Sequence, residues 1–225
     1  MFGIGGGSVR IPLLNLAGLP LLNAFGINLL VIPFSSSVGA LSQRRNINKK
    51  VAVYMIIGGT LGSITGAFLA GLIPMLALAI IFVVVSVMTV LGIYLDRITP
   101  ALARKISPGS WNIIAGSLAL SLIIGMRGGS GGALFPPFLR AMKLNIHKAI
   151  ATSLFVTIFT AMAAIVIYWH RGDIVWLPAI FVLIGSMIGA RIGSRASLKT
   201  KPTRLQIGLT ILVVALAFIT IYKAL

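Results

Sequence analysis

Nearly the whole chain divides into long apolar segments separated by short loops that carry most of the basic residues. A transmembrane helix needs about 20 consecutive, mostly apolar residues, and these segments have that length. With 58% hydrophobic residues, 9% charged residues and a mean hydropathy of +1.08, the chain has more apolar surface than one soluble core could bury. The alternating pattern of barrel strands is absent. We therefore expect an all-α integral membrane protein that forms a helical bundle.

The formal net charge of +17 comes from 19 Lys and Arg residues against two Asp residues. In a soluble protein this charge would suggest nucleic acid as the partner. Here the basic residues lie in short loops between apolar segments, where positive charge orients a membrane protein. We therefore expect a multi-pass protein of the cell (plasma or inner) membrane whose partner is the lipid bilayer and not nucleic acid. The chain has no cysteine, so disulfides and thiolate metal sites are excluded.

Two stretches of the chain share a glycine-rich pattern, "GIGGGSVRIPLL" near the start and "GMRGGSGGALFPPFL" in the middle. Gly7 then matches Gly132, and Pro12 matches Pro137, each pair separated by 125 positions. A ladder of small residues is also duplicated, and we interpret its glycines as helix-packing positions. The ladders consist of Gly58, Gly62 and Gly66 in one half and Gly185, Gly189 and Gly193 in the other. The sequence therefore predicts two related halves.

We expect a first repeat over 1–95, a cytoplasmic linker over 96–110 and a second repeat over 111–225. The predicted helices of the first repeat are 8–17, 21–42, 51–73 and 75–95, and those of the second are 111–126, 133–143, 147–169, 174–194 and 204–224.

The most basic loops, "QRRNINKK", "DRITPALARK" and "SRASLKTKPTR", are expected in the cytoplasm. Each predicted span changes the side of the membrane. Counting spans back from the last of these loops places "HRGD" outside and "RAMKLNIHK" in the cytoplasm. The segments 111–126 and 133–143 must then leave and return on the same side, with only six residues between them. This pair should dip to the middle of the bilayer and turn back. The sequence thus predicts an inverted-topology repeat with broken or re-entrant half-helices at glycine-rich bends.

Non-helical backbone at membrane depth is tolerated only where it is buried in protein or lines a watery cavity. A half-helix that begins at such a bend points unpaired N–H groups and a partial positive charge inward, and two opposed starts make an anion site. A charge deep in the membrane also marks a pathway or a partnered site. The candidate residues of this site are Gly5, Gly6, Gly7, Ser8, Arg10, Asn28, Arg127, Gly128, Gly129, Ser130, Gly131, Gly132, Thr152 and Ser153.

Less specific interpretations stay open for some of these residues. Arg10 is as well explained by snorkelling to a surface, and Thr152 and Ser153 by hydrogen bonds within their own helix. His147 and His170 lie near opposite span ends, and neither makes a metal site alone. We expect no metal, no cofactor and no catalytic residues.

At these glycine motifs the sequence resembles the sulfite exporter TauE/SafE family of membrane anion permeases. The segments that carry the resemblance are "GIGGGSVRIPLL", "GMRGGSGGALFPPFL", "GINL" at 26–29 and "ATSL" at 151–154, and the resemblance covers essentially the whole chain. It implies movement of small sulfur-containing or organic anions across the cell membrane.

Two departures from the family pattern stand out. Family members usually have an apolar helix ahead of the first glycine motif, and this chain begins almost at Gly3. A misassigned start, a shortened chain or a dispensable half-helix would each explain this. The family motif ordinarily has a small residue where this chain has Arg127, which favours a more strongly anionic ligand.

The sequence therefore predicts a multi-pass transporter, in the export direction, of small inorganic or organic anions such as sulfite or sulfonates, working by alternating access. An enzyme would need a nucleophile with a base, or a cluster of His and carboxylates, and the sequence has neither. The alternative is a non-transporting membrane scaffold or assembly protein. The glycine ladders would also permit a homodimer.

Overall fold

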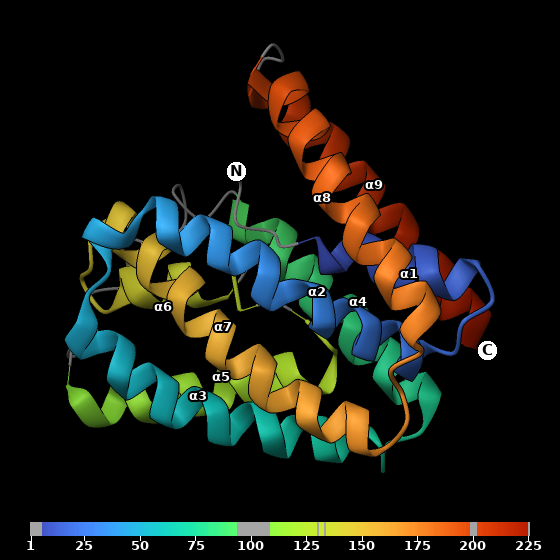
Figure 1. The fold of residues 1–225 in the computed structure, drawn as a ribbon, viewed down its shortest axis with the longest axis horizontal. Helices are drawn as coiled ribbons and strands as arrows, with labels where there is room; N and C mark the ends of the chain where they lie inside the picture. The colour runs from blue at the N-terminus through green and yellow to red at the C-terminus, as the bar shows by residue number, and fades with distance from the viewer. Residues whose placement is uncertain (1–5, 94–108, 130, 133, 199–201, 225) are drawn as a thin grey trace.

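The computed structural model of this chain describes residues 6–93, 109–129, 131, 132, 134–198 and 202–224 (Figure 1). Every regular element within these ranges is helical, which confirms the expected all-α class. The elements are α1 (Gly7–Leu16), α2 (Leu21–Ser42), the short 3-10 helix η1 (Arg44–Asn46), α3 (Lys49–Ala70), α4 (Met75–Ile93), α5 (Ser110–Met126), α6 (Phe135–Ala141), α7 (Ile146–His170), α8 (Trp176–Leu198) and α9 (Pro202–Ala224).

Three of these helices, α2, α3 and α7, are long and apolar enough to cross a membrane by length and composition. The predicted span 21–42 is the observed α2, and the other predicted helices agree with observed ones to within four residues at each end. Most of the expected linker 96–110 lies outside the described residues. The division into two inverted repeats stays a prediction.

The starts of α3 and α7 are set by asparagine caps. The side-chain oxygen of Asn48 accepts a hydrogen bond from the Val51 amide over 3.2 Å, and that of Asn145 accepts one from the Lys148 amide over 2.8 Å. Each cap satisfies one of the N–H groups that a helix start leaves free. The backbone N–H of Asn48 also donates to Thr152 Oγ1 of α7 over 3.0 Å, and the two helix starts therefore lie side by side. We call this end of the molecule, where η1, α3 and α7 meet, the basic end.

The glycine ladder of α3 packs directly on α5. A Cβ added at Gly58, Gly62 or Gly66 would overlap the backbone carbonyl of Ile114, Leu118 or Leu122, respectively. The two helices therefore run parallel, with their backbones in contact over three successive turns. The packing role predicted for this ladder is confirmed, since only glycine permits so close an approach.

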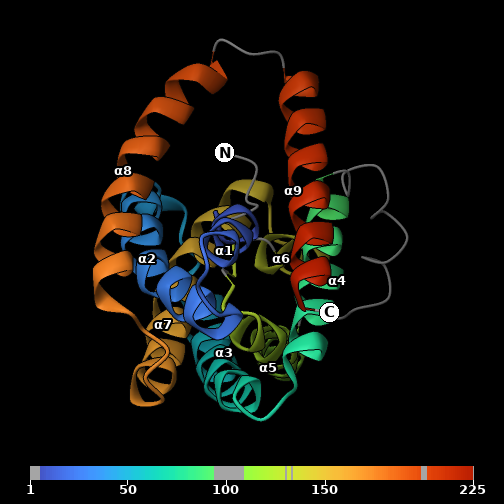
Figure 2. The same cartoon turned by 90° about the vertical axis from the view of Figure 1, so that its right-hand side faces the viewer.

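The matching ladder of α8 does not pack in this way. A Cβ added at Gly185 or Gly189 would meet nothing within 4 Å, and the packing expected there is wrong for the described chain. The side-chain surroundings of Gly193 lie outside the described residues. The difference arises because α8 extends away from the helices that surround α3 and α5 (Figure 1), and α9 lies on the far side of α1 from it (Figure 2).

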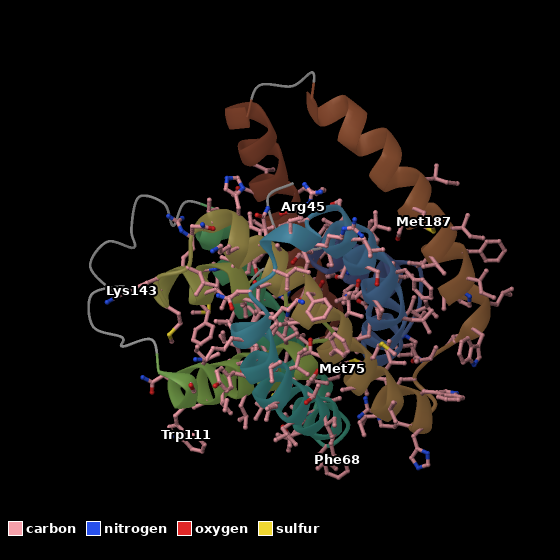
Figure 3. All side chains as sticks on the ribbon, turned by 60° about the vertical axis from the view of Figure 1, so that its left-hand side comes forward. Arg45, Phe68, Met75, Trp111, Lys143 and Met187 are labelled. Carbon is pink, nitrogen blue, oxygen red and sulfur yellow. The ribbon has the colours of Figure 1, made fainter. Side chains whose placement is uncertain are left out.

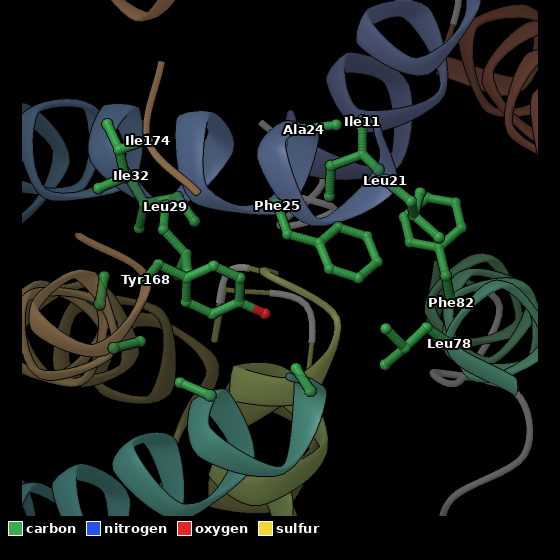
Figure 4. Close-up of a cluster of buried hydrophobic side chains, with 14 of the residues drawn as sticks. Ile11, Leu21, Ala24, Phe25, Leu29, Ile32, Leu78, Phe82, Tyr168 and Ile174 are labelled. Carbon is green, nitrogen blue, oxygen red and sulfur yellow. The ribbon is translucent and has the colours of Figure 1, made fainter. Parts of the chain in front are cut away.

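A buried apolar cluster joins α2, α4 and α7 around the interior (Figure 4). The rings of Phe25 on α2 and Phe82 on α4 stack with centroids 6.1 Å apart. Tyr168 of α7 lies fully buried in the same cluster, and its hydroxyl group points toward the end of α5. This cluster positions the bend that follows α5.

The segment after α5 turns back on itself, as the sequence predicts. Phe138 of α6 packs against Gly116, in the first half of α5, so α6 returns along the helix that precedes it. The bend between them contacts Phe25, in the first quarter of α2. The Gly128 part of the bend therefore lies farther from the basic end than the predicted mid-helix level, whereas Gly131 lies beside Thr157, at the middle of α7. In the view of Figure 2, α1 lies near the centre of the molecule, with α8 and α9 on either side.

Candidate functional site

The bend after α5 is built around Gly128. Gly128 has a φ of +59°, a left-handed conformation that glycine adopts at little cost. A Cβ there would also overlap the backbone and Cβ of Phe25. The hydroxyl of Tyr168 donates to the carbonyl oxygens of Gly125 and Met126, at 3.0 and 3.3 Å, and so satisfies the last turn of α5. The backbone is thus free to leave the helix at Arg127.

Asn28 connects the start of α1 to this bend. Its Nδ2 donates to the Gly128 carbonyl over 2.7 Å, and the same amide group lies directly against Gly7, where a Cβ would come within 2.6 Å of Nδ2. Asn28 itself is fully buried on α2. The two glycine-rich segments identified in the sequence therefore meet at one side chain, although they are more than 100 residues apart in the chain.

Helix α1 begins at this meeting point. The amides of Val9 and Arg10 both donate to the Gly6 carbonyl, at 3.3 and 2.9 Å. The amides of Gly7 and Ser8 precede the first hydrogen bond of the helix, and they carry the positive end of its dipole. The start of α1 lies within one residue of the predicted position, but the amides of Val9 and Arg10 are taken up by hydrogen bonds within the helix. The second half differs, because α6 begins at Phe135 rather than at 133 and is only seven residues long.

Arg127 is 1% exposed, and so is buried as completely as the apolar residues around it. Its Nη1 donates to the Ser86 hydroxyl of α4 over 3.5 Å, and its guanidinium lies over the Phe82 ring, 5.8 Å from the centroid. Its Nε lies against Gly129 and has no hydrogen-bond partner within the described chain. No carboxylate pairs with Arg127 in the part of the chain that the structure describes. A buried charge held only by a hydroxyl and a ring is poorly compensated.

The guanidinium of Arg10 folds back over the start of its own helix. A Cβ at Gly6 would meet Arg10 Nη2 and lie 2.7 Å from its Nε. The residue is half-buried, and its Nη1 is buried without a partner in the described structure. Arg10 therefore covers the α1 start.

Orphaned polar atoms gather at this junction. Across the described residues, six buried side-chain nitrogen or oxygen atoms lack a hydrogen-bond partner, and four of them belong to candidate site residues. These four are Ser8 Oγ, Arg10 Nη1, Asn28 Oδ1 and Arg127 Nε. An unsatisfied buried polar group costs about 1–3 kcal/mol, so each of these atoms would gain from a hydrogen-bond partner.

Other predicted site residues are placed differently. Thr152 lies at the basic end, where its hydroxyl accepts the Asn48 amide, and the Ser153 hydroxyl donates to the Ile150 carbonyl within its own helix. Gly131 lies beside Phe135 and Thr157, and Gly132 is buried in the same turn. Gly5 and Ser130 lie outside the described residues.

Several residues of the site were missed in the sequence. They include Ser86, which contacts Arg127, and Thr157, which contacts Gly131. The side chains around the bend are those of Phe25, Phe82 and Tyr168. Ser86 carried one signal, as a hydroxyl inside the very apolar α4. Hydroxyls in apolar helices usually bond their own backbone, as Thr157 does to Ser153, so this signal was not specific.

The chemistry available at the junction is hydrogen bonding together with positive charge. Its polar atoms are two guanidinium groups, one amide, hydroxyls and helix-start N–H groups, a set that suits an anion. The described residues contain no cluster of three or more His, Cys, Asp or Glu that could hold a metal ion.

Comparison with known proteins gives consistent matches over nearly the whole chain. The "Probable membrane transporter protein ORF9" of Sinorhizobium sp is 25% identical over 95% of this chain and 83% of its own length. The "Probable membrane transporter protein YunE" of Bacillus subtilis is 26% identical over 99% of this chain and 92% of its own length. No solved structure gives a significant match. The profile of the sulfite exporter TauE/SafE family matches residues 1–220, and the chain therefore belongs to this family.

Proposed function

We propose that this chain is a membrane transporter of small inorganic or organic anions, such as sulfite or sulfonates, and that it exports them by alternating access. Membership of the TauE/SafE family and the names of its relatives support a membrane transporter rather than an enzyme. The substrate and the direction are parts of the proposal that rest on the site and on its charge.

One observation carries the choice of an anion. Arg127 is buried, has an unpartnered Nε and has no carboxylate partner in the described chain, and it directly precedes the glycine bend that meets the α1 start. A negative solute at this junction would satisfy the orphaned donors and compensate the buried charge. A scaffold protein would gain nothing from an uncompensated arginine in its interior.

The same contacts suggest how the site opens. Asn28 joins the α1–α2 segment to the α5–α6 bend through one hydrogen bond, and Phe25 and Phe82 close the space beside Arg127. We propose that these segments rock against each other, so that the anion is released when the Asn28–Gly128 contact separates. Within the described residues, no helix carries a carboxylate. No membrane-embedded carboxylate there could therefore serve a proton or sodium relay. An interior-negative potential alone gives a monovalent anion about 2.3 kcal/mol per 100 mV, or about fifty-fold accumulation outside.

A flux assay with purified protein in proteoliposomes tests the proposal. Radiolabelled or fluorescently reported sulfite, thiosulfate, sulfoacetate and simple carboxylates are screened under an imposed potential, with potassium and a neutral sugar as controls. We expect saturable anion flux that increases when the compartment containing the anion is negative. A protein that moves none of these anions, or that moves cations equally well, would contradict the proposal and favour the scaffold alternative.

A further inference from the structure

A groove at the basic end lies outside the site described above. It has a volume of about 260 Å³ and runs between α2 and α7, beneath η1. The groove is lined chiefly by Ser37, Leu41, Arg44, Ile47, Phe155 and Ile158. We propose that this groove binds an anionic phospholipid, with the phosphate group against Arg44 and an acyl chain along Leu41, Phe155 and Ile158.

The apolar part of the groove suits a lipid chain. Leu41 is 69% exposed, and Phe155 and Ile158 are partly exposed beside it. The Phe155 ring packs edge to face against the Phe159 ring, with centroids 5.2 Å apart. Farther along, Leu154 of α7 packs on Gly39 of α2, so the two helices are held together at the base of the groove. A preformed apolar groove that opens on the side of a membrane protein is in contact with acyl chains.

The charge around the groove favours an anionic headgroup. Five exposed basic side chains lie at this end, on η1 and in the first turns of α3 and α7, and they are Arg44, Arg45, Lys49, Lys50 and Lys148. The chain has only two acidic residues, and one of them, Asp173, pairs with Arg171. The one remaining acidic side chain, that of Asp96, cannot balance five cations, so the compensating charge must come from outside the protein. Basic pockets between transmembrane helices bind anionic lipid headgroups in this way.

The opposite end of α3 and α7 provides a contrast. A larger groove of about 400 Å³ there is lined by Phe68, Leu72, Ile167, His170 and Arg171. Its arginine is already compensated, because Arg171 pairs with Asp173 and donates to the Ala67 carbonyl over 2.8 Å. An apolar groove with a neutralised arginine has no preference for an anionic lipid. The proposal is therefore specific to the basic end, where Arg44 lies free of any described carboxylate.

Native mass spectrometry of the purified full chain, in mixed micelles of phosphatidylglycerol and phosphatidylcholine, tests the proposal. Arg44→Gln removes the charge at the groove, and Arg45→Gln removes an equivalent exposed charge that does not line it. We expect retained phosphatidylglycerol to fall roughly tenfold in Arg44→Gln, which corresponds to one charge-assisted hydrogen bond, and to change much less in Arg45→Gln. Equal losses in both variants would overturn the proposal in favour of a diffuse surface effect.

A second variant tests the groove itself. Ile158→Trp fills the apolar part and leaves every charge in place, so we expect it to lose phosphatidylglycerol as Arg44→Gln does, with an unchanged melting temperature in pure detergent. Retention of phosphatidylglycerol by folded Ile158→Trp would overturn the proposal. So would equal retention of phosphatidylcholine by the unmodified chain, or complete displacement of lipid by millimolar inorganic phosphate, which would indicate a free-anion site.

Discussion

The side-chain amide of Asn28 donates a 2.7 Å hydrogen bond to the carbonyl oxygen of Gly128 while lying against Gly7. One buried residue on α2 thus holds together two glycine-rich segments that lie far apart in the chain. Both segments interrupt or begin helices, and both contact this side chain. The arrangement makes Asn28 the contact on which the geometry of the junction depends.

Replacing Asn28 by Leu tests this contact. The substitution keeps a side chain of similar size, removes the donor and leaves the buried Gly128 carbonyl unsatisfied. We expect a loss of about 1–3 kcal/mol in stability, measured as a lower thermal midpoint in detergent, together with reduced anion flux. An unchanged midpoint with unchanged flux would show that the hydrogen bond contributes little.

Gly128→Ala and Gly18→Ala separate backbone strain from packing. Both glycines have a positive φ, +59° at Gly128 and +98° at Gly18. A Cβ added at Gly128 would overlap the backbone of Phe25, whereas one added at Gly18 would meet nothing within 4 Å. We expect Gly18→Ala to fold, with a cost of about 1–2 kcal/mol from the left-handed conformation alone. Gly128→Ala should give little folded protein by size-exclusion chromatography. Equal yields of the two variants would argue against the close approach at Phe25.

The two glycine ladders predict opposite responses to the same substitution. A methyl group at Gly62 overlaps the Leu118 carbonyl, whereas one at Gly189 meets open space. Gly62→Ala should therefore lower the thermal midpoint by several degrees, and Gly189→Ala should leave it within about 1 °C, since surface changes rarely exceed about 0.5 kcal/mol. A marked loss at Gly189 would instead reveal a partner helix against α8 in the membrane.

Tyr168→Phe removes a single oxygen atom. That hydroxyl donates to the Gly125 and Met126 carbonyls at the end of α5, and its loss leaves them buried without this donor. We expect about 1–2 kcal/mol of destabilisation, because the Met126 carbonyl loses this donor, while the Gly125 carbonyl still accepts from the Gly128 backbone amide and the ring packing is kept. The thermal midpoint of Tyr168→Phe is compared with that of a control variant, Tyr222→Phe, which loses the hydroxyl of a tyrosine that is 83% exposed. Equal midpoints would show that the α5 end does not need the tyrosine.

Much of the helical framework was predictable because apolar length, basic loops and turn residues act locally. The boundaries of α2 follow from Pro20 before it and the charged "QRR" sequence after it. The bend at Gly128 was also predictable, since consecutive glycines cannot sustain a helix at membrane depth. The start of α6 was placed two residues early, because Gly131, Gly132 and Leu134 lie in turns before the helix begins at Phe135.

The parts of the site that could not be predicted depend on contacts between distant helices. Ser86 and Phe82 lie against Arg127 only because α4 packs beside the bend, and no spacing within α4 indicates this. The α8 ladder was expected to pack because its sequence matches that of α3. The sequence pattern records which positions are small, but it does not show whether a partner helix is present, and the described chain places none at Gly189.

The most direct test of the account is anion flux through Arg127 variants reconstituted in proteoliposomes at matched protein density. Arg127→Met keeps much of the side-chain volume and removes the charge, Arg127→Lys restores a charge, and Arg45→Gln serves as a control for loss of an exposed positive charge. We predict that folded Arg127→Met loses at least about tenfold in flux, that Arg127→Lys recovers part of it, and that Arg45→Gln behaves as the unmodified chain. Flux and apparent affinity unchanged in folded Arg127→Met would contradict the claim that this buried arginine binds the transported anion.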